Sequence, residues 1–402
     1  MTERPFTIAI AEEQLLLLQA KLDLTVFPDE LDDAGWQYGV PLAEIKRLTA
    51  YWRNGYDWRK HEADLNRELS QFNRQIDIDN QETIDIHYTH QKSEVASAIP
   101  LLFIHGWPGS FIEARNILPV LTAPPPGQPG FDVVAFSLPG FGFSEAPKKK
   151  GFQIQHYAEV GHKLMLALGY NEYVTQGGDW GALITRKICC DYGGTHAKAW
   201  HTNMAIFGRP PHPLYEPISS LLHAITPYTD FEKHSLDRAK WFEEFGSGFY
   251  AVQKTRPQTL GYSLADSPVG LLAWIYEKLV LGTDNYAWTD DEVLTWISIY
   301  CFSRAGPAAS LRIYYEVESS GGFTAVPTPK VPIGFSFFPE EFGGVPRSWL
   351  RREGNVVFEA EHTRGGHFAA YERPGDLASD LRKMFGMGGP AFGVVPGKTG
   401  YA

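Results

Sequence analysis

Three short apolar runs, each leading into a glycine-rich turn, constrain the fold of this chain more than any other feature. The runs Leu101–Ile104, Val133–Phe136 and Tyr173–Thr175 lead into the sequences HGWPG, LPGFG and GGDWG. Helical stretches separate the runs, as in a parallel sheet whose connecting helices cover both faces. The carboxyl ends of such strands meet at one edge of the sheet, where α/β proteins bind their ligands. The sequence therefore predicts an α/β fold with its turns gathered at one edge.

The same pattern divides the chain into five consecutive segments. The opening is interpreted as a helical arm, since the stretch Pro41–Trp52 carries apolar residues at helical spacing. The strand pattern stops near Ala205, where helical segments rich in Trp and Tyr predict a cap inserted into the sheet domain. It returns with Ile333–Phe338 and Asn355–Phe358, and the last segment, rich in Gly and Pro, is predicted to be mobile. The segments are an N-terminal helical arm (1–95), the first part of the core (96–204), a helical cap (205–328), the second part of the core (329–385) and a flexible tail (386–402).

Length and charge narrow the classes of function. With 402 residues, of which 44% are hydrophobic, the chain can bury one large core. Its formal net charge of -11 argues against nucleic acid or an anionic membrane surface as partner, because both require basic patches. The three cysteines fit a reducing compartment, and Met1–Pro5 lack the basic region and apolar stretch of a secretory signal. We therefore expect a soluble, cytoplasmic protein without a transmembrane anchor.

The stretch Gly177–Gly181 has the form of a nucleophile elbow, in which small residues flank a central nucleophile between a strand and a helix. The small residues let the strand turn sharply and hold the central side chain in a strained conformation above the sheet. Taken alone, the pattern also fits a glycine turn capped by Asp179. Because an apolar strand precedes it and the helical stretch Ala182–Cys190 follows, we interpret Asp179 as a carboxylate nucleophile.

The turn after the first apolar run lies where enzymes with such an elbow form an oxyanion loop. It contains His105, Gly106, Trp107 and Pro108. We expect the backbone N–H groups of Trp107 and Trp180 to stabilise negative charge on the carbonyl oxygen of an ester at the elbow. His105 precedes the loop, so a structural hydrogen-bonding role is expected for it.

The general base of such a site comes last in chain order, after the final strand. His367 has this position, in the sequence GGHF, whose small residues leave the loop free to bring the imidazole over the elbow. The supporting acid can follow either the sixth or the seventh strand. No carboxylate occurs in His201–Met204, whereas the later sequence FPEEF contains Glu340 and Glu341. From the residues alone, either glutamate can be the acid.

Four motifs together resemble the microsomal-type epoxide hydrolases of the α/β-hydrolase fold, in particular their soluble fungal and bacterial branch. The motifs are HGWPGS (105–110), GGDWG (177–181), FSFFP (335–339) and GGHFAA (365–370). The similarity extends over nearly the whole chain to about residue 385. It implies that Asp179 is the nucleophile, His367 the base and Glu341, rather than Glu340, the acid. We expect no cofactor and no metal, and the resemblance suggests a homodimer.

The reaction implied by this resemblance is hydrolysis of an epoxide to a vicinal diol. A carboxylate that attacks an epoxide carbon forms an alkyl ester that water can cleave, whereas a serine would form an ether. His367 would take a proton from water, and Glu341 would orient the imidazole. The predicted partners are a small apolar epoxide and water, in a step of either detoxification or secondary metabolism.

Members of this family also use two cap tyrosines that donate hydrogen bonds to the epoxide oxygen. Tyr314 matches the second of them. The first is expected at a fixed distance before Thr255–Pro257, and ungapped counting gives Phe249, with Tyr250 next to it. One residue of offset turns a side chain by about 100° in a helix. Tyr250 is therefore expected to serve only where the backbone is irregular.

Three other functions fit parts of this pattern. A haloalkane or haloacid dehalogenase of the same fold also uses an Asp and a His, often with a Trp beside the nucleophile, as Trp180 is here. The motifs HGWPGS and GGHFAA are not typical of that class. A small-molecule receptor on the same fold can dispense with a catalytic residue, whereas Asp179, Glu341 and His367 are all present in this chain. A lipase or esterase is disfavoured because the elbow has no serine.

Overall fold

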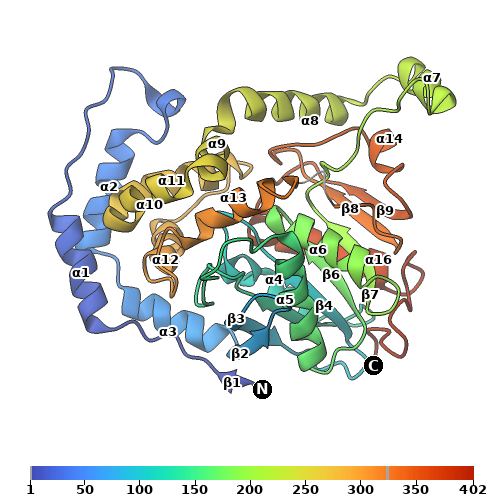
Figure 1. The fold of residues 1–402 in the computed structure, drawn as a ribbon, viewed down its shortest axis with the longest axis horizontal. Helices are drawn as coiled ribbons and strands as arrows, with labels where there is room; N and C mark the ends of the chain where they lie inside the picture. The colour runs from blue at the N-terminus through green and yellow to red at the C-terminus, as the bar shows by residue number, and fades with distance from the viewer. Residues whose placement is uncertain (1, 323–325) are drawn as a thin grey trace.

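One mixed sheet forms the centre of the protein (Figure 1), described here from a computed structural model that covers residues 2–322 and 326–402. Its strands are β1 (Arg4–Pro5), β2 (Gln71–Asp77), β3 (Thr83–Gln91), β4 (Ile99–Ile104), β5 (Phe131–Phe136), β6 (Tyr173–Gly177), β7 (Ala197–Thr202), β8 (Ile333–Phe337) and β9 (Val356–Glu361). Over the described residues these nine strands pair in the order β1-β2-β3-β5-β4-β6-β7-β8-β9. The pairs from β5 to β9 in that order are parallel, and the pairs that involve β2 or β3 are antiparallel.

The central strands are buried on both faces because helices cover them. Every residue of β4 is buried, and its sequence IPLLFI contains no polar side chain. The helices that accompany the sheet are α4 (Ile117–Thr122), α5 (Ile154–Ala167), α6 (Trp180–Asp191) and α16 (Pro374–Phe385). α5 packs beside α6, and α4 packs beside α16 (Figure 1). The predicted α/β class, with a mostly parallel sheet and accompanying helices, is confirmed.

The end of the predicted helical arm differs from the prediction. Its helices α1 (Glu12–Asp23), α2 (Leu42–Asn54) and α3 (Trp58–Glu68) are present, but β2 and β3 follow them and belong to the sheet. The sequence of β3, TIDIHYTHQ, alternates apolar with polar residues, and nearly all of them are buried. His87 shows why this is possible, since its ring nitrogens lie 2.8 Å from Ser137 Oγ and 3.0 Å from Gln71 Oε1. Because hydrogen bonds of this kind allow polar residues to be buried, the sequence pattern did not indicate a strand here.

The tail from residue 386 is packed, whereas the sequence predicted a mobile segment. Ala391 and Val395 are buried. The backbone N–H of Gly400 donates to Ser97 O over 2.7 Å, and Gly400 O accepts from the N–H of Gly130 over 2.8 Å. Glycine and proline content therefore indicates turns here, and the tail lies against the edge of the core.

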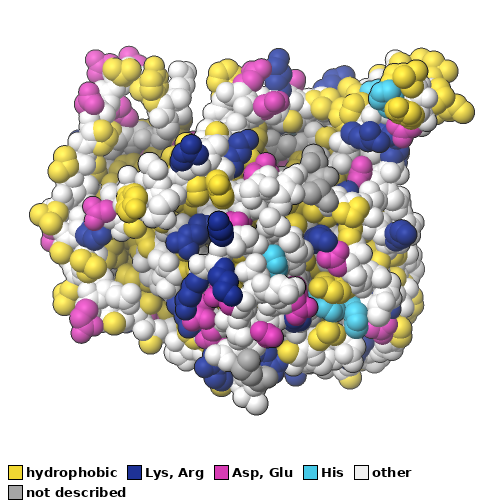
Figure 2. All heavy atoms as spheres, in the orientation of Figure 1, with side chains coloured by type: hydrophobic (Ala, Val, Ile, Leu, Met, Phe, Trp, Pro, Cys, Tyr) yellow, Lys and Arg dark blue, Asp and Glu magenta, His cyan; other side chains and the backbone are white. Residues whose placement is uncertain are grey.

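Helices fill the chain between β7 and β8, and we call this set the cap. They are α7 (Pro217–Ile225), α8 (Asp230–Trp241), the π-helical turn η3 (Phe242–Gly246), α9 (Gly248–Thr255), α10 (Pro257–Asp266), α11 (Pro268–Leu281), α12 (Asp290–Cys301) and α13 (Arg312–Glu318). α7 projects from the molecule with Ile218, Leu221 and Ile225 exposed, and apolar side chains gather at this corner in Figure 2. Within residues 2–322 and 326–402, no helix has the length and apolar character needed to cross a membrane.

The helices of the arm pack against helices of the cap (Figure 1). α1 and α2 contact α11, while α2 and α3 contact α12. Arg47 forms an ion pair of 2.5 Å with Asp290 at the start of α12, and the hydroxyl of Tyr56 lies 3.0 Å from Thr295 Oγ1. The arm therefore fixes the position of α12, which lies close to the site described next.

Candidate active site

Asp179 lies at the turn between β6 and α6 with backbone angles of φ 52° and ψ -131°. A positive φ is uncommon outside glycine, and such conformations cost roughly 1–3 kcal/mol. Surrounding contacts must therefore hold the turn. Gly181 permits the tightest of them, because a Cβ there would lie 1.9 Å from the carbonyl oxygen of Ile104 in β4. The close approach places the carboxylate above the carboxyl end of the sheet.

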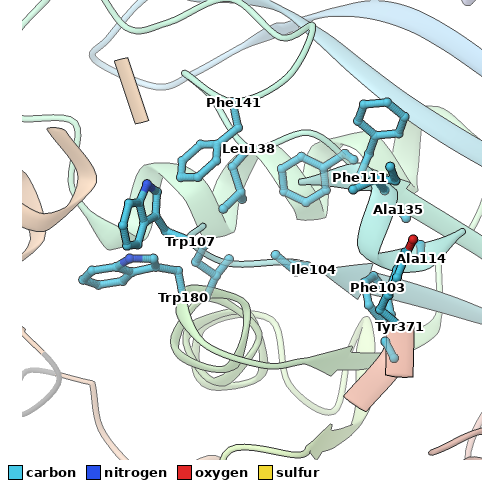
Figure 3. Close-up of a cluster of buried hydrophobic side chains, with 14 of the residues drawn as sticks. Phe103, Ile104, Trp107, Phe111, Ala114, Ala135, Leu138, Phe141, Trp180 and Tyr371 are labelled. Atoms are coloured by element: carbon cyan, nitrogen blue, oxygen red, sulfur yellow. The ribbon is translucent and has the colours of Figure 1, made fainter. Parts of the chain in front are cut away.

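The loop after β4 approaches the same carboxylate. The backbone N–H of Trp107 donates to Asp179 Oδ1 over 2.7 Å, and Trp180 begins α6, so its N–H lies at a helix N-terminus. Gly106 leaves room for the carboxylate, since a Cβ at this position would lie 2.1 Å from Oδ1. Figure 3 shows the indoles of Trp107 and Trp180 beyond the end of the strand that carries Ile104. Oδ1 therefore lies where backbone donors can stabilise negative charge.

His105 is buried behind this loop. Its Nε2 accepts a hydrogen bond of 3.2 Å from the N–H of Leu138, and its Nδ1 lies 2.9 Å from Gly106 O. Burial lowers the pKa of His105 to about 4. The ring is therefore neutral near pH 7, and its hydrogen bonds link the turn after β4 to the turn after β5.

His367 reaches Asp179 from the loop after β9. Its Nε2 lies 3.4 Å from Asp179 Oδ2, and its Nδ1 lies 2.6 Å from Glu341 Oε1. Glu340 turns the other way and pairs with Arg238 of α8 at 3.3 Å. Of the two glutamates that the sequence left open, Glu341 is thus the one in contact with His367.

The loop that carries His367 is fixed by groups outside its own sequence. The backbone N–H of His367 donates to Gly282 O over 2.7 Å, at the end of α11. The N–H of Gly366 donates to Glu372 Oε1 over 2.8 Å, and burial raises the pKa of Glu372 to about 7. The position of the imidazole therefore depends on the cap as well as on the sheet.

The two neighbouring carboxylates determine the charge of His367. Burial of the ring lowers its pKa, but Glu341 and Asp179 outweigh the burial and hold the pKa of His367 well above 6.5. The ring is accordingly an imidazolium between two carboxylates. Removal of the charge on Asp179 would remove one of the two groups that raise this pKa.

A cavity of about 330 Å³ lies between Asp179 and the cap. Its walls are mainly aromatic and apolar, as a small apolar ligand requires. The seven residues that the sequence predicted as catalytic or as oxyanion donors all line it: Trp107, Asp179, Trp180, Tyr250, Tyr314, Glu341 and His367. The lining residues are Trp107, Pro108, Asp179, Trp180, Met204, Ile206, Ala239, Phe242, Glu243, Ser247, Phe249, Tyr250, Lys278, Tyr314, Glu341, Phe342, Gly343 and His367.

Tyr314 projects from α13 into this cavity. Its ring centroid lies 4.8 Å from that of Trp180 and 5.8 Å from that of Trp107, with the rings edge-on. Burial, together with the negative charge of Asp179, raises the pKa of Tyr314 well above 10. The hydroxyl therefore keeps its proton and can donate it to an oxygen bound in the cavity.

Phe249 and Tyr250 both reach the cavity from the first turn of α9. The backbone is irregular directly before this turn, because the π-helical turn η3 ends at Gly246 and Ser247 separates it from α9. Phe249 stacks on Trp107 with 5.1 Å between centroids, while the ring of Tyr250 lies 5.2 Å from that of Tyr314. The Tyr250 hydroxyl donates to Glu318 Oε1 over 2.6 Å. The structure thus brings Tyr250 to the site with its proton directed at a carboxylate.

Sequence reasoning missed several polar groups around the site. Trp296 and Tyr300 of α12 contact the oxyanion loop, and Glu113 lies against the same loop. Lys278 lines the cavity, and Glu318 accepts the hydrogen bond of Tyr250. The four-residue spacing of Trp296 and Tyr300 puts both on one helix face, which was the signal available. Helical spacing gives no information about what that face contacts.

Comparison with known proteins places this geometry in a family. A family model described as "Epoxide hydrolase N terminus" matches residues 3–114, and one described as "alpha/beta hydrolase fold" matches residues 99–265. A putative epoxide hydrolase of Stigmatella aurantiaca is 38% identical over 391 residues, which cover 95% of this chain and 84% of that protein. The chain belongs to the epoxide hydrolases. Epoxide hydrolase 1 of Sus scrofa is 35% identical over 412 residues, covering 96% of this chain and 88% of the relative.

A solved structure supports the same assignment of this epoxide hydrolase. The epoxide hydrolase of Aspergillus niger superimposes with a TM-score of 0.81 and 33% identity, and the match covers 95% of each chain. The resemblance that the sequence motifs indicated, the α/β-hydrolase fold and the enzyme class are confirmed.

Proposed function

We propose that this epoxide hydrolase opens its substrate through a covalent ester on Asp179, which water activated by His367 and Glu341 then cleaves to a vicinal diol. The observation that carries the proposal is the different surroundings of the two Asp179 oxygens. Oδ1 accepts the N–H of Trp107 at 2.7 Å, whereas Oδ2 lies 3.4 Å from His367 Nε2, and Asp179 lines the cavity. One oxygen is held for the carbonyl position, and the other is left to attack.

In the first step Asp179 Oδ2 forms a bond to an epoxide carbon, and the bond from that carbon to the ring oxygen breaks. The electron pair of the broken bond moves to the ring oxygen, which becomes an alkoxide. Tyr314 donates its proton to that oxygen, and Tyr250 is the second donor once its hydroxyl leaves Glu318. Oriented donors at the site of developing charge are the largest contribution that such a site makes to rate.

Ester formation changes the state of His367. The ester carries no charge, so one of the two groups that raise the pKa of His367 is lost. The imidazolium then gives its proton to the tyrosinate left by the first step, and a neutral imidazole remains beside Glu341. The base therefore becomes available at the point where water has to be deprotonated.

In the second step a water attacks Cγ of the Asp179 ester and gives a proton to His367 Nε2. Negative charge moves to Oδ1, where the N–H groups of Trp107 and Trp180 stabilise it. The tetrahedral intermediate collapses as the bond between Cγ and the former Oδ2 breaks, and this oxygen takes a proton from the His367 imidazolium and leaves as part of the diol, so that Asp179 is first a carboxylic acid. One proton returns to His367 as Asp179 regains its charge, so charge and atoms balance over the cycle.

The rival reaction is dehalogenation of a haloalkane or haloacid by the same Asp and His. Tyr314 and Tyr250 favour the epoxide, because the leaving oxygen of an epoxide stays bound to carbon and requires a proton. A departing halide does not. The apolar walls of the cavity favour an uncharged substrate in either case.

The test compares two substrates and one variant. The purified enzyme is incubated with an aryl epoxide and, separately, with a haloalkane of similar size, and diol and halide are measured. Diol without halide is expected, and Asp179→Ala is expected to abolish diol formation while the far-UV circular dichroism stays unchanged. Halide release, or full activity in Asp179→Ala, would refute the proposal.

The cytoplasmic location and the homodimer stay predictions. So does the choice between detoxification and secondary metabolism, since the geometry of the site is the same for both.

A further inference from the structure

Two carbonyl groups of the oxyanion loop accept hydrogen bonds from one face of α12. Trp296 Nε1–H donates to Pro108 O over 2.6 Å, and the hydroxyl of Tyr300 donates to Gly109 O over 2.6 Å. Both side chains are buried, at 0% and 4% exposure. Trp296 and Tyr300 are four residues apart, so one helix face holds two consecutive peptides of the loop.

We infer that Trp296 and Tyr300 are positioning residues for the hydrolytic half of the reaction, acting through the Trp107 N–H. The inference rests on the proposed function, because it assigns the two side chains to the second of its two steps. The cap then has a role beyond enclosing the substrate, since one of its helices aligns the donor that stabilises the oxyanion.

The contacts with α12 hold the part of the loop that follows this donor, while the Trp107 indole itself stacks on Phe249. Trp107 N–H points at Asp179 Oδ1, and the peptides that follow it would be free to rotate if their carbonyls had only solvent partners. Glu113 also lies against the loop, because a Cβ at Gly109 would lie 1.4 Å from its Oε1. The loop therefore contacts both α12 and Glu113.

The hydroxyl of Tyr300 is a dependable donor in this position. Burial raises its pKa well above 10, and the nearby carboxyl groups of Glu113 and Asp179 act in the same direction. The hydroxyl therefore keeps its proton at neutral pH. Trp296 packs edge-on against Phe368, the residue after His367, with 5.6 Å between centroids, so its indole cannot swing away from the loop without a vacancy in the core.

The two steps depend on the Trp107 donor in opposite ways. Negative charge on Oδ1 decreases when the carboxylate becomes an ester and increases when water attacks the ester. A donor at Oδ1 thus gives the first step no advantage and accelerates the second. Loss of its alignment is expected to slow hydrolysis of the ester and to leave its formation nearly unchanged.

The experiment measures both steps in one set of samples. Enzyme in excess is mixed with an aryl epoxide, quenched in acid at short intervals and digested, and the esterified fraction of the Asp179 peptide is followed by mass spectrometry. Tyr300→Phe removes one hydrogen bond with little change of volume. Tyr173→Phe is its control, because Tyr173 is also buried and its hydroxyl lies 2.9 Å from His162 Nδ1, at the far end of β6 from Asp179.

A second pair of variants tests the indole. Trp296→Phe removes the donor to Pro108 O, and Trp288→Phe is its control. Trp288 packs 5.6 Å from Trp296 but donates to Leu279 O and not to the loop. Equal losses of melting temperature within each pair would show that stability does not account for a difference in rate.

We expect Tyr300→Phe and Trp296→Phe to slow decay of the ester roughly 5- to 20-fold, a part of what removal of an oxyanion donor costs, while its formation changes less than about twofold. Both controls are expected to match the wild type. Decay at the wild-type rate in both variants, equal slowing of both steps, or equal slowing in the controls would overturn the inference. Absence of any ester in the wild type would instead refute the proposed function, so the two failures are distinguishable.

Discussion

The sheet side and the cap side of the cavity are built in different ways. Asp179, Glu341 and His367 each follow a strand end, and their mutual distances are set by the order of strands in the sheet. Tyr250 and Tyr314 come from separate helices of the cap, and Tyr250 already shares its proton with Glu318. The comparison teaches that the strand order places the nucleophile and base, with one further contact from the His367 loop to the end of α11, whereas the acid catalysts depend entirely on how the cap helices pack.

The largest expected effect on the sheet side is loss of the base. His367→Gln keeps a polar side chain but cannot take a proton from water, so the ester is expected to form and persist. Hydrolysis is expected to fall roughly 10³-fold, within the range for a positioned general base. Rapid quench with mass spectrometry of the Asp179 peptide checks this. A variant with low turnover and no accumulated ester would contradict the assignment of His367 to hydrolysis of the ester rather than to its formation.

Glu341→Gln is expected to have the next largest effect, a loss of roughly 10- to 100-fold in kcat. Glu341 raises the pKa of His367, so its removal lowers that pKa in the ester as well. The imidazole must be neutral to accept a proton, and the acid limb of the kcat profile therefore moves to lower pH. Glu340→Gln is the matched control, because Glu340 pairs with Arg238 and not with His367. An acid limb that moves to higher pH in Glu341→Gln would contradict the account.

On the cap side, Tyr314→Phe is expected to slow ester formation roughly tenfold, less than the roughly 10²-fold lower end of general acid catalysis, because Tyr250 is still present as a second donor. Tyr250→Phe is expected to slow it only a few-fold, since the Tyr250 hydroxyl must first leave Glu318.

Glu318→Gln removes this competition and is expected to bring the contribution of Tyr250 closer to that of Tyr314. Stopped-flow measurement of ester formation ranks the three variants. Equal effects of the two tyrosines in the wild-type background would show that Glu318 does not restrain Tyr250.

The smallest effect concerns stability on the sheet side. Burial raises the pKa of Glu113 from 4.5 to about 8, with the negative charge of Asp179 acting in the same direction. A raised carboxyl pKa means that stability is highest below about pH 4.5 and falls as pH rises toward 8. Glu113→Gln stays neutral, so its melting temperature is expected to gain a few degrees on the wild type between pH 5.5 and pH 8.5. A difference in melting temperature that stays constant with pH would show that the ionisation of Glu113 does not affect the stability of the fold.

Most of the sheet side could be predicted because its signals are local. A nucleophile elbow, a loop after an earlier strand and a histidine after the last strand fix Asp179, Trp107 and His367 by position in the sequence. The choice between Glu340 and Glu341 came only from the family resemblance, since both follow the same strand. The direction of each side chain in the loop decides which glutamate reaches His367, and the pattern of residues in the sequence does not show that direction.

The remainder of the molecule shows why pattern fails elsewhere. β3 was missed because its polar residues are buried in hydrogen bonds, and the tail was misjudged because its glycines form packed turns. Contacts of Trp296 with the oxyanion loop and of Tyr250 with Glu318 join segments far apart in the chain. Tertiary packing creates such contacts, and no local spacing encodes them.

A single turnover in ¹⁸O-labelled water tests the central claim most directly. With enzyme in excess over an aryl epoxide, water attacks Cγ of the ester, so the label is expected in the carboxylate of Asp179 and not in the diol. The same reaction with His367→Gln is expected to leave the Asp179 peptide esterified and unlabelled. Label in the diol, with none in Asp179, would mean that water attacks the epoxide directly and would contradict the covalent mechanism.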